Sequence, residues 1–130
     1  MKRNFLFYTS AFAVGAIGYP LLEVAFRGRS HISMALAGGL SLVFIFYLGR
    51  QAPKASLLLR AALSALFITA LEFSIGVVVN LNLHLGVWDY TGLPLNLWGQ
   101  ICLPFTGIWF LLSLPLCALA KRLSFLAQTD

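Results

Sequence analysis

Four long apolar runs dominate this chain, and each is long enough to cross a lipid bilayer as a helix. A membrane-spanning helix needs about 20 predominantly apolar residues. The runs cover residues 5–26, 32–48, 57–83 and a segment from near residue 97 to the basic pair at 121–122. Hydrophobic residues make up 60% of the chain and charged residues only 10%, which is not the composition of a soluble globular protein. We therefore predict an all-α membrane protein with four transmembrane helices in a single domain over residues 1–130.

The basic residues predict how these helices are oriented. The first run begins after basic residues, as a secretory signal does, but its apolar core exceeds the roughly 7–15 residues of a signal peptide, so we expect a retained helix. By the positive-inside rule both termini and the 49–56 loop are cytoplasmic, and the loops at 27–31 and 84–97 face outward. We expect a multi-pass protein of the cell inner (plasma) membrane. The residues on the cytoplasmic side are Lys2, Arg3, Arg50, Lys54, Arg60, Lys121 and Arg122, against Arg27 and Arg29 on the outer side.

The net charge and the cysteines carry little functional information. The net charge of +5 does not indicate a nucleic-acid partner, because the basic residues lie at helix ends rather than on one soluble face. Cys102 and Cys117 lie in one predicted helical segment, about 22 Å apart along its axis. That separation is too long for a disulfide, so we expect both to be buried packing residues.

Glu72 lies in the middle of the third apolar run. A carboxylate at this depth costs roughly 2.5–3.5 kcal/mol on insertion scales, which makes it a functional residue by default. On a helical wheel it belongs to a small and polar stripe within an arc of about 100°. We predict that this stripe faces protein or water rather than lipid. Its members are Ala61, Ala65, Thr69, Glu72, Gly76 and Asn80.

Polar residues concentrate in the predicted outer half. Glu23 and Arg27 stand four positions apart, the spacing of a helical ion pair. Asp89 is suited to accept hydrogen bonds within a turn, and Asn96 is placed to cap the fourth helix. Trp88 and Tyr90 suit a membrane interface, so anchoring and capping alone are one interpretation of this region.

The other interpretation is a polar pocket open to the outside. A bundle of four helices has few places to bury polar groups, so these side chains are expected to converge between the helix ends. The predicted substrate-binding residues are Glu23, Arg27, Arg29, His31, Glu72, Asn80, Trp88, Asp89, Tyr90 and Asn96.

The loop after the third run resembles the signature of a known family. The residues that carry the resemblance are Trp88-Asp89-Tyr90-Thr91, then Pro94-Leu95-Asn96, then Gly99-Gln100-Ile101-Cys102-Leu103. This string is similar to that of the small membrane proteins grouped as ABC-transporter type IV, the CmpB family. The stretch 18–23, the pair Arg27-Gly28 and the acid Glu72 also resemble family features, so the resemblance covers about residues 15–110. It implies a transporter-like membrane protein.

Two departures bear on the ligand. Residues 29–34 do not match the Gly-Pro and Pro-Ile-Tyr-Gly elements of that family. Gln100 stands where the family commonly has arginine, which removes a charge from the start of the fourth predicted helix.

The preferred functional hypothesis is a small transporter or permease-like protein. Its outward-facing pocket would bind a charged or polar solute of unknown identity, and Glu72 would couple movement to protonation. The sequence contains no Gly-x-x-x-x-Gly-Lys-Ser/Thr motif, so an ATP-driven version needs a separate nucleotide-binding subunit. Four helices can surround a solute path with only a thin layer of protein, which favours a homodimer or a larger membrane complex in the lipid bilayer. No cofactor and no nucleic acid is expected.

Two alternatives belong to other functional classes. One is an interfacial membrane enzyme acting on a lipid-linked substrate, with His31 and carboxylates as acid, base or metal ligands. No His-Glu-x-x-His spacing occurs, so we assign no catalytic residues, leave the metal open and favour a protein that is not an enzyme. The other alternative is a membrane assembly or scaffold protein, in which the polar groups only fix helix packing.

Overall fold

The computed structural model describes residues 2–28 and 30–128 of the 130-residue chain, without the side chains of residues 3, 26, 27 and 124–128. It is mostly helical. In chain order the elements are α1 (Lys2–Arg27), α2 (Ile32–Gln51), α3 (Leu57–Gly76), the π-helical segment η1 (Val77–Asn82), β1 (Asn96–Leu97), β2 (Ile101–Cys102) and α4 (Leu103–Gln128).

Within these described residues, four helical stretches are long and apolar enough to cross a membrane, as the sequence predicts. They are Asn4–Ala25, Ile32–Gln51, Leu57–Asn82 and Leu103–Leu123. The fourth helix differs from the prediction at its start. Residues 96–102 instead form a small antiparallel hairpin, in which Asn96 pairs with Cys102 and Leu97 with Ile101.

Side-chain caps define where α2 and α3 begin. The Ser56 hydroxyl accepts a hydrogen bond from the backbone N–H of Leu59 (3.1 Å), and His31 Nδ1 accepts one from the N–H of Ser33 (3.1 Å). Each bond satisfies an N–H that the first turn of a helix leaves without a partner. The η1 segment then continues α3 with the wider π-helical repeat.

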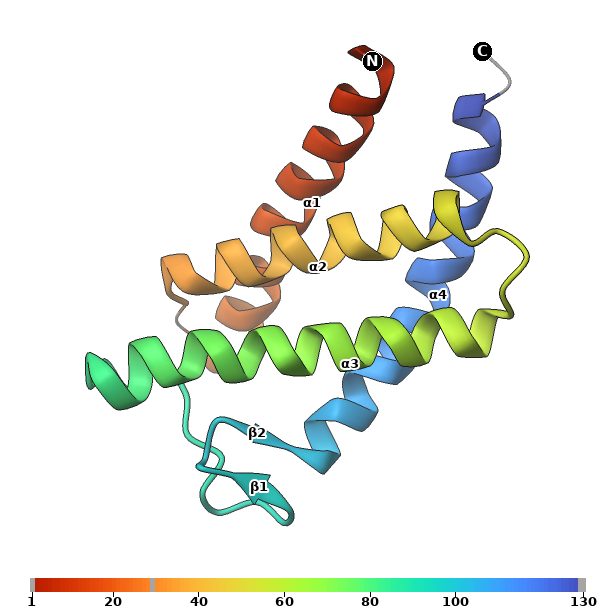
Figure 1. The fold of residues 1–130 in the computed structure, drawn as a ribbon. Coiled ribbons are helices and arrows are strands. Elements are labelled where there is room, and N and C mark those ends of the chain that lie inside the picture. Colours follow the sequence, from red (N-terminus) through yellow and green to blue (C-terminus); the bar gives the residue numbers. More distant parts are fainter. Residues whose placement is uncertain (1, 29, 129–130) are drawn as a thin grey trace.

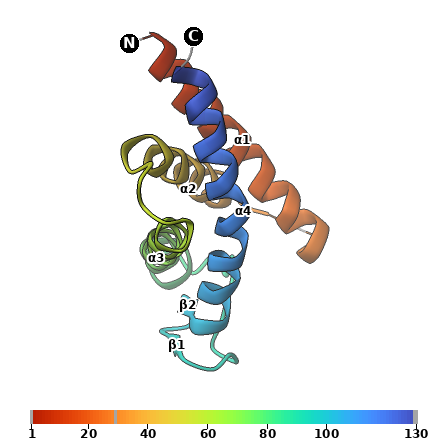
Figure 2. The same ribbon diagram turned by 90° about the vertical axis from the view of Figure 1, so that its right-hand side faces the viewer.

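The helices form two crossing layers (Figures 1 and 2). The helices α2 and α3 lie side by side and run antiparallel, and α1 and α4 cross them on one face. The helix α1 packs mainly on α2, whereas α4 packs on both α2 and α3. In both views the two termini lie at one end of the molecule and the β1–β2 hairpin lies at the other.

Glycines set the closest approach between α1 and α2. A Cβ atom built on Gly15 would overlap the carbonyl of Gly38, and one built on Gly38 would overlap the carbonyl of Gly15. Such contacts let helix backbones pack tightly in a membrane, where burial of apolar surface drives little association.

The buried apolar residues form two clusters. One groups Cys117 with Ala11, Leu42, Ile45, Phe46, Ala61 and Ala120. The other groups Cys102 with Met34, Val79, Trp88 and Tyr90. Both cysteines are buried and free, which confirms the prediction that they pack in the core, although Cys102 lies in β2 rather than in the fourth helix.

Candidate functional site

The centre of the candidate site is Glu72, which is only 5% exposed and lies near the C-terminal end of α3, within the Leu57–Asn82 span. Tyr90 donates its hydroxyl to Oε2 (2.9 Å), and Trp109 of α4 donates its indole N–H to Oε1 (3.1 Å). Each carboxylate oxygen therefore has a donor from a different part of the chain. Hydrogen bonds are stronger in a low-dielectric interior than in water, and this arrangement explains how the fold accommodates an acid there.

The small and polar stripe of α3 faces protein, as predicted. Ala61 and Ala65 are 0% and 3% exposed, and Gly76 is buried. Thr69 forms a hydrogen bond with the hydroxyl of Thr106 in α4 (2.9 Å). The stripe thus packs against α4 and against the loop that precedes it.

The end of α3 and its η1 extension hold this loop in place. Asn80 Oδ1 accepts the backbone N–H of Val87 (2.7 Å), and its amide donates to Gln100 Oε1 (2.8 Å). The indole of Trp88 donates to the carbonyl of Gln100 (2.9 Å). Gly76 leaves room for this contact, since a Cβ atom there would lie 2.5 Å from Gln100 Oε1 and 2.9 Å from the Trp88 ring.

Two further side chains brace the loop internally. Asp89 Oδ1 accepts the N–H of Thr91 (2.9 Å), which confirms its predicted role in a turn. Asn96 Oδ1 accepts the N–H of Gly99 (3.1 Å), and its amide donates to the carbonyl of Leu93 (2.9 Å). The prediction that Asn96 caps the fourth helix is wrong, because the β1–β2 pairing occupies residues 96–102 and α4 begins only at Leu103.

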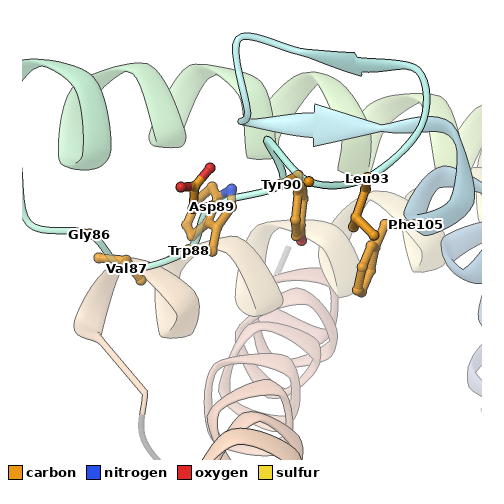
Figure 3. Close-up of a pocket in the computed structure, with 8 residues that line it drawn as sticks. Gly86, Val87, Trp88, Asp89, Tyr90, Leu93 and Phe105 are labelled. Atoms are coloured by element: carbon orange, nitrogen blue, oxygen red, sulfur yellow. The ribbon is translucent and has the colours of Figure 1, made fainter.

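An open cavity of about 740 Å³ lies beside this loop (Figure 3). Asp89 is exposed at its wall, and the Tyr90 ring stacks on Phe105 with the centroids 4.7 Å apart. Tyr90 is a lining residue of the cavity, and its hydroxyl binds Glu72. It therefore links the cavity wall to the buried carboxylate. The lining residues are Gly86, Val87, Trp88, Asp89, Tyr90, Gly92, Leu93 and Phe105.

A smaller cavity of about 120 Å³ adjoins the first and shares Gly86 and Val87 with it. Glu23 of α1 and His31 before α2 both line this space, together with Ser30, Met34 and Leu85. His31 is half-buried and also caps α2.

The predicted binding residues thus divide into three groups. Glu72, Asn80, Trp88 and Tyr90 belong to two hydrogen-bond networks, in which Glu72 binds Tyr90 and both Asn80 and Trp88 bind Gln100. Glu23, His31 and Asp89 line the two cavities, and Asn96 braces the loop. Arg29 and the side chain of Arg27 lie outside the described residues. Within the described part of the chain, no group of three or more His, Cys, Asp or Glu side chains could hold a metal ion.

Two members of these networks are not among the predicted binding residues. They are Gln100, which is 3% exposed, and Trp109. A signal existed for Trp109, since a tryptophan deep in a span, away from the membrane interface, needs an acceptor for its N–H. For Gln100 the signal was a lone amide between apolar residues.

Comparison with known proteins gives the family. No curated protein and no solved structure matches this chain. A family model described as "Putative ABC-transporter type IV" (ABC_trans_CmpB) matches residues 32–127, which include α2, α3, the loop network and most of α4. The match begins after α1, so the resemblance over residues 18–28 lies outside it. With most of its length matched, this multi-pass membrane protein belongs to the ABC-transporter type IV (CmpB) family.

Proposed function

We propose that this protein is a permease-like transporter component that binds a charged or polar solute in the open cavity beside Tyr90. The family and the four apolar helices support a transporter-like membrane protein. The observation that carries the finer proposal is the position of Tyr90, which contacts both the cavity and Glu72.

The geometry supports a direct coupling between solute and carboxylate. A solute that forms a hydrogen bond with the Tyr90 hydroxyl competes with the Tyr90–Glu72 bond. When that bond is lost, Oε2 of Glu72 loses a hydrogen-bond donor inside the bundle. Glu72 then compensates by taking up a proton or by accepting a hydrogen bond from the solute. Binding in the cavity therefore changes the state of a residue within the membrane-spanning part.

The charges near the cavities favour a solute with donor groups. Asp89 is exposed on the first cavity and Glu23 lies on the second, so an acid lines each space. A cation or a solute rich in N–H and O–H groups meets acceptors at both positions. The proposed partners are a second copy of the chain or a larger complex that includes a separate nucleotide-binding subunit.

Thermal unfolding of the detergent-purified protein tests this function. A ligand that binds the folded state raises the apparent unfolding temperature by mass action. The panel consists of inorganic cations, amines, amino acids and sugars, applied to the wild type and to Glu72→Gln, Asp89→Asn and Tyr47→Phe. Tyr47 is 49% exposed on α2 and serves as the control.

We expect at least one compound to stabilise the wild type and Tyr47→Phe, and to stabilise Glu72→Gln and Asp89→Asn less or not at all. A panel without any stabilising compound, or one whose compounds stabilise all four proteins equally, would overturn the proposal.

A scaffold function is the second candidate, and one observation favours it. Among the described residues, Ser113 Oγ is the one buried side-chain nitrogen or oxygen without a hydrogen bond. The Glu72 network is therefore satisfied internally, as a purely structural network would be. The same panel separates the two functions, since a scaffold protein gives no solute-dependent stabilisation.

A further inference from the structure

The β1–β2 end of the molecule places apolar side chains outward and polar side chains inward. Leu95 is 75% exposed and Trp98 is 66% exposed, whereas Gln100 is 3% exposed. Leu97 and Leu103, at the start of α4, are 48% and 58% exposed. A loop that meets water normally shows the opposite distribution, so this hairpin is suited to an apolar environment.

Two of these exposed apolar residues have an energetically unfavourable backbone conformation. Leu95 and Trp98 have positive φ angles of 53° and 55°. The left-handed region is unfavourable for an L-residue that carries a Cβ, and it is normally occupied by Gly, Asn or Asp. Here it is occupied by two large apolar residues whose side chains are mostly exposed.

Several backbone groups of the hairpin have partners within the protein. Tyr90 N–H donates to the Gly99 carbonyl (2.8 Å), and Gln100 N–H donates to the Leu97 carbonyl (3.0 Å). The Gln100 side-chain amide donates to the Trp98 carbonyl (2.9 Å). Irregular backbone can approach hydrocarbon only when its polar groups are satisfied in this way, because no water is available there.

The apolar surface of the hairpin is continuous with that of the membrane spans. The Trp98 ring lies 5.5 Å from the ring of Phe73 on α3, centroid to centroid. At the other end of the hairpin, β2 leads directly into Leu103, the first residue of the α4 span. The apolar side chains of the hairpin therefore adjoin those of the α3 and α4 spans.

We propose that the β1–β2 hairpin inserts into the bilayer, with Leu95, Leu97 and Trp98 at the boundary between headgroups and acyl chains. An indole suits this depth, because its ring is apolar and its N–H is polar. The exposed turn at Asp89, Thr91 and Gly92 remains in water beside the open cavity. The hairpin thus holds the cavity mouth at the level of the headgroups.

A pair of fluorescent labels tests the insertion. Leu95→Cys and Gly92→Cys are labelled with an environment-sensitive fluorophore and placed in vesicles of phosphatidylethanolamine and phosphatidylglycerol. The two native cysteines are buried at 3% and 0% exposure, so labelling at the new site is favoured. Gly92 is exposed and has open space at its Cβ position, which makes it the matched control in the same loop.

We expect the label at position 95 to emit at shorter wavelength than the label at 92, and to lose fluorescence when spin-labelled phosphatidylcholine is added. Equal emission and equal quenching at the two positions would overturn the proposal.

If a labelled variant does not fold, the fluorescence of the native tryptophans provides a second test. Trp88 and Trp109 are 5% and 9% exposed, so Trp98 should dominate quenching by spin-labelled lipid. We expect Trp98→Phe to lose most of that quenching. Quenching that is unchanged in Trp98→Phe would contradict insertion of the hairpin.

Discussion

At the scale of single residues, Glu72 shows that an acid buried in a membrane protein requires hydrogen-bond donors within the fold. Glu72 has a phenol and an indole as donors, one from the loop and one from α4. The sequence was sufficient to identify Glu72 as exceptional, because an acid within an apolar run is costly wherever the helix points. It was not sufficient to identify Trp109 as a partner, because that contact depends on how α3 and α4 rotate against each other.

Removal of the Tyr90 hydroxyl is expected to destabilise the protein while the fold is retained. Tyr90→Phe leaves Oε2 of Glu72 without the donor described here, and a lost hydrogen bond to a buried carboxylate costs about 1.5–3 kcal/mol. Thermal or denaturant unfolding in detergent measures this loss. Tyr47→Phe removes a hydroxyl from an exposed tyrosine and should leave stability within about 0.5 kcal/mol of the wild type. Equal stability of the two variants would mean that the Tyr90–Glu72 bond contributes nothing.

At the scale of elements, the spans follow from the sequence but the loop does not. Long apolar runs identify membrane helices because the hydrocarbon thickness fixes their length. The stretch from residue 97 to 102 is also largely apolar, so the sequence predicts that it belongs to the fourth helix. What separates it is the hydrogen bonding of Asn96 and the strand pairing with Cys102, which are tertiary features without a periodic signal.

The two glycines of α1 should respond differently to substitution. Gly15→Ala places a methyl group against the carbonyl of Gly38 and forces α1 and α2 apart, a type of overpacking that costs about 1–3 kcal/mol. Gly18 has nothing within 4 Å of its Cβ position, so Gly18→Ala should be neutral or slightly stabilising. Unfolding curves of the two variants in detergent measure the difference. Equal stability would show that the Gly15–Gly38 contact does not hold α1 on the bundle.

At the scale of the whole molecule, both termini lie at one end and the cavity loop lies at the other (Figure 1). This arrangement agrees with an even number of spans, but it does not fix which end is cytoplasmic. The distribution of basic residues predicts that the termini lie inside and the loop outside.

Labelling of intact cells decides the orientation. We expect a membrane-impermeant thiol reagent to modify Gly92→Cys in the loop and not Lys121→Cys near the end of α4. Both positions are exposed on the protein, so the membrane alone should determine their reactivity. If the reagent modifies Lys121→Cys and does not modify Gly92→Cys, the predicted orientation is wrong.

The proposed function requires that binding of a solute in the cavity depends on the carboxylate of Glu72. The most direct test is equilibrium binding, by titration calorimetry, of the compound that stabilises the wild-type protein most. We expect Glu72→Gln to weaken this binding at least about tenfold, equivalent to about 1.4 kcal/mol, and Tyr47→Phe to leave it unchanged. Equal affinity of the wild type and Glu72→Gln would contradict the claim, since the buried carboxylate would then have no part in binding.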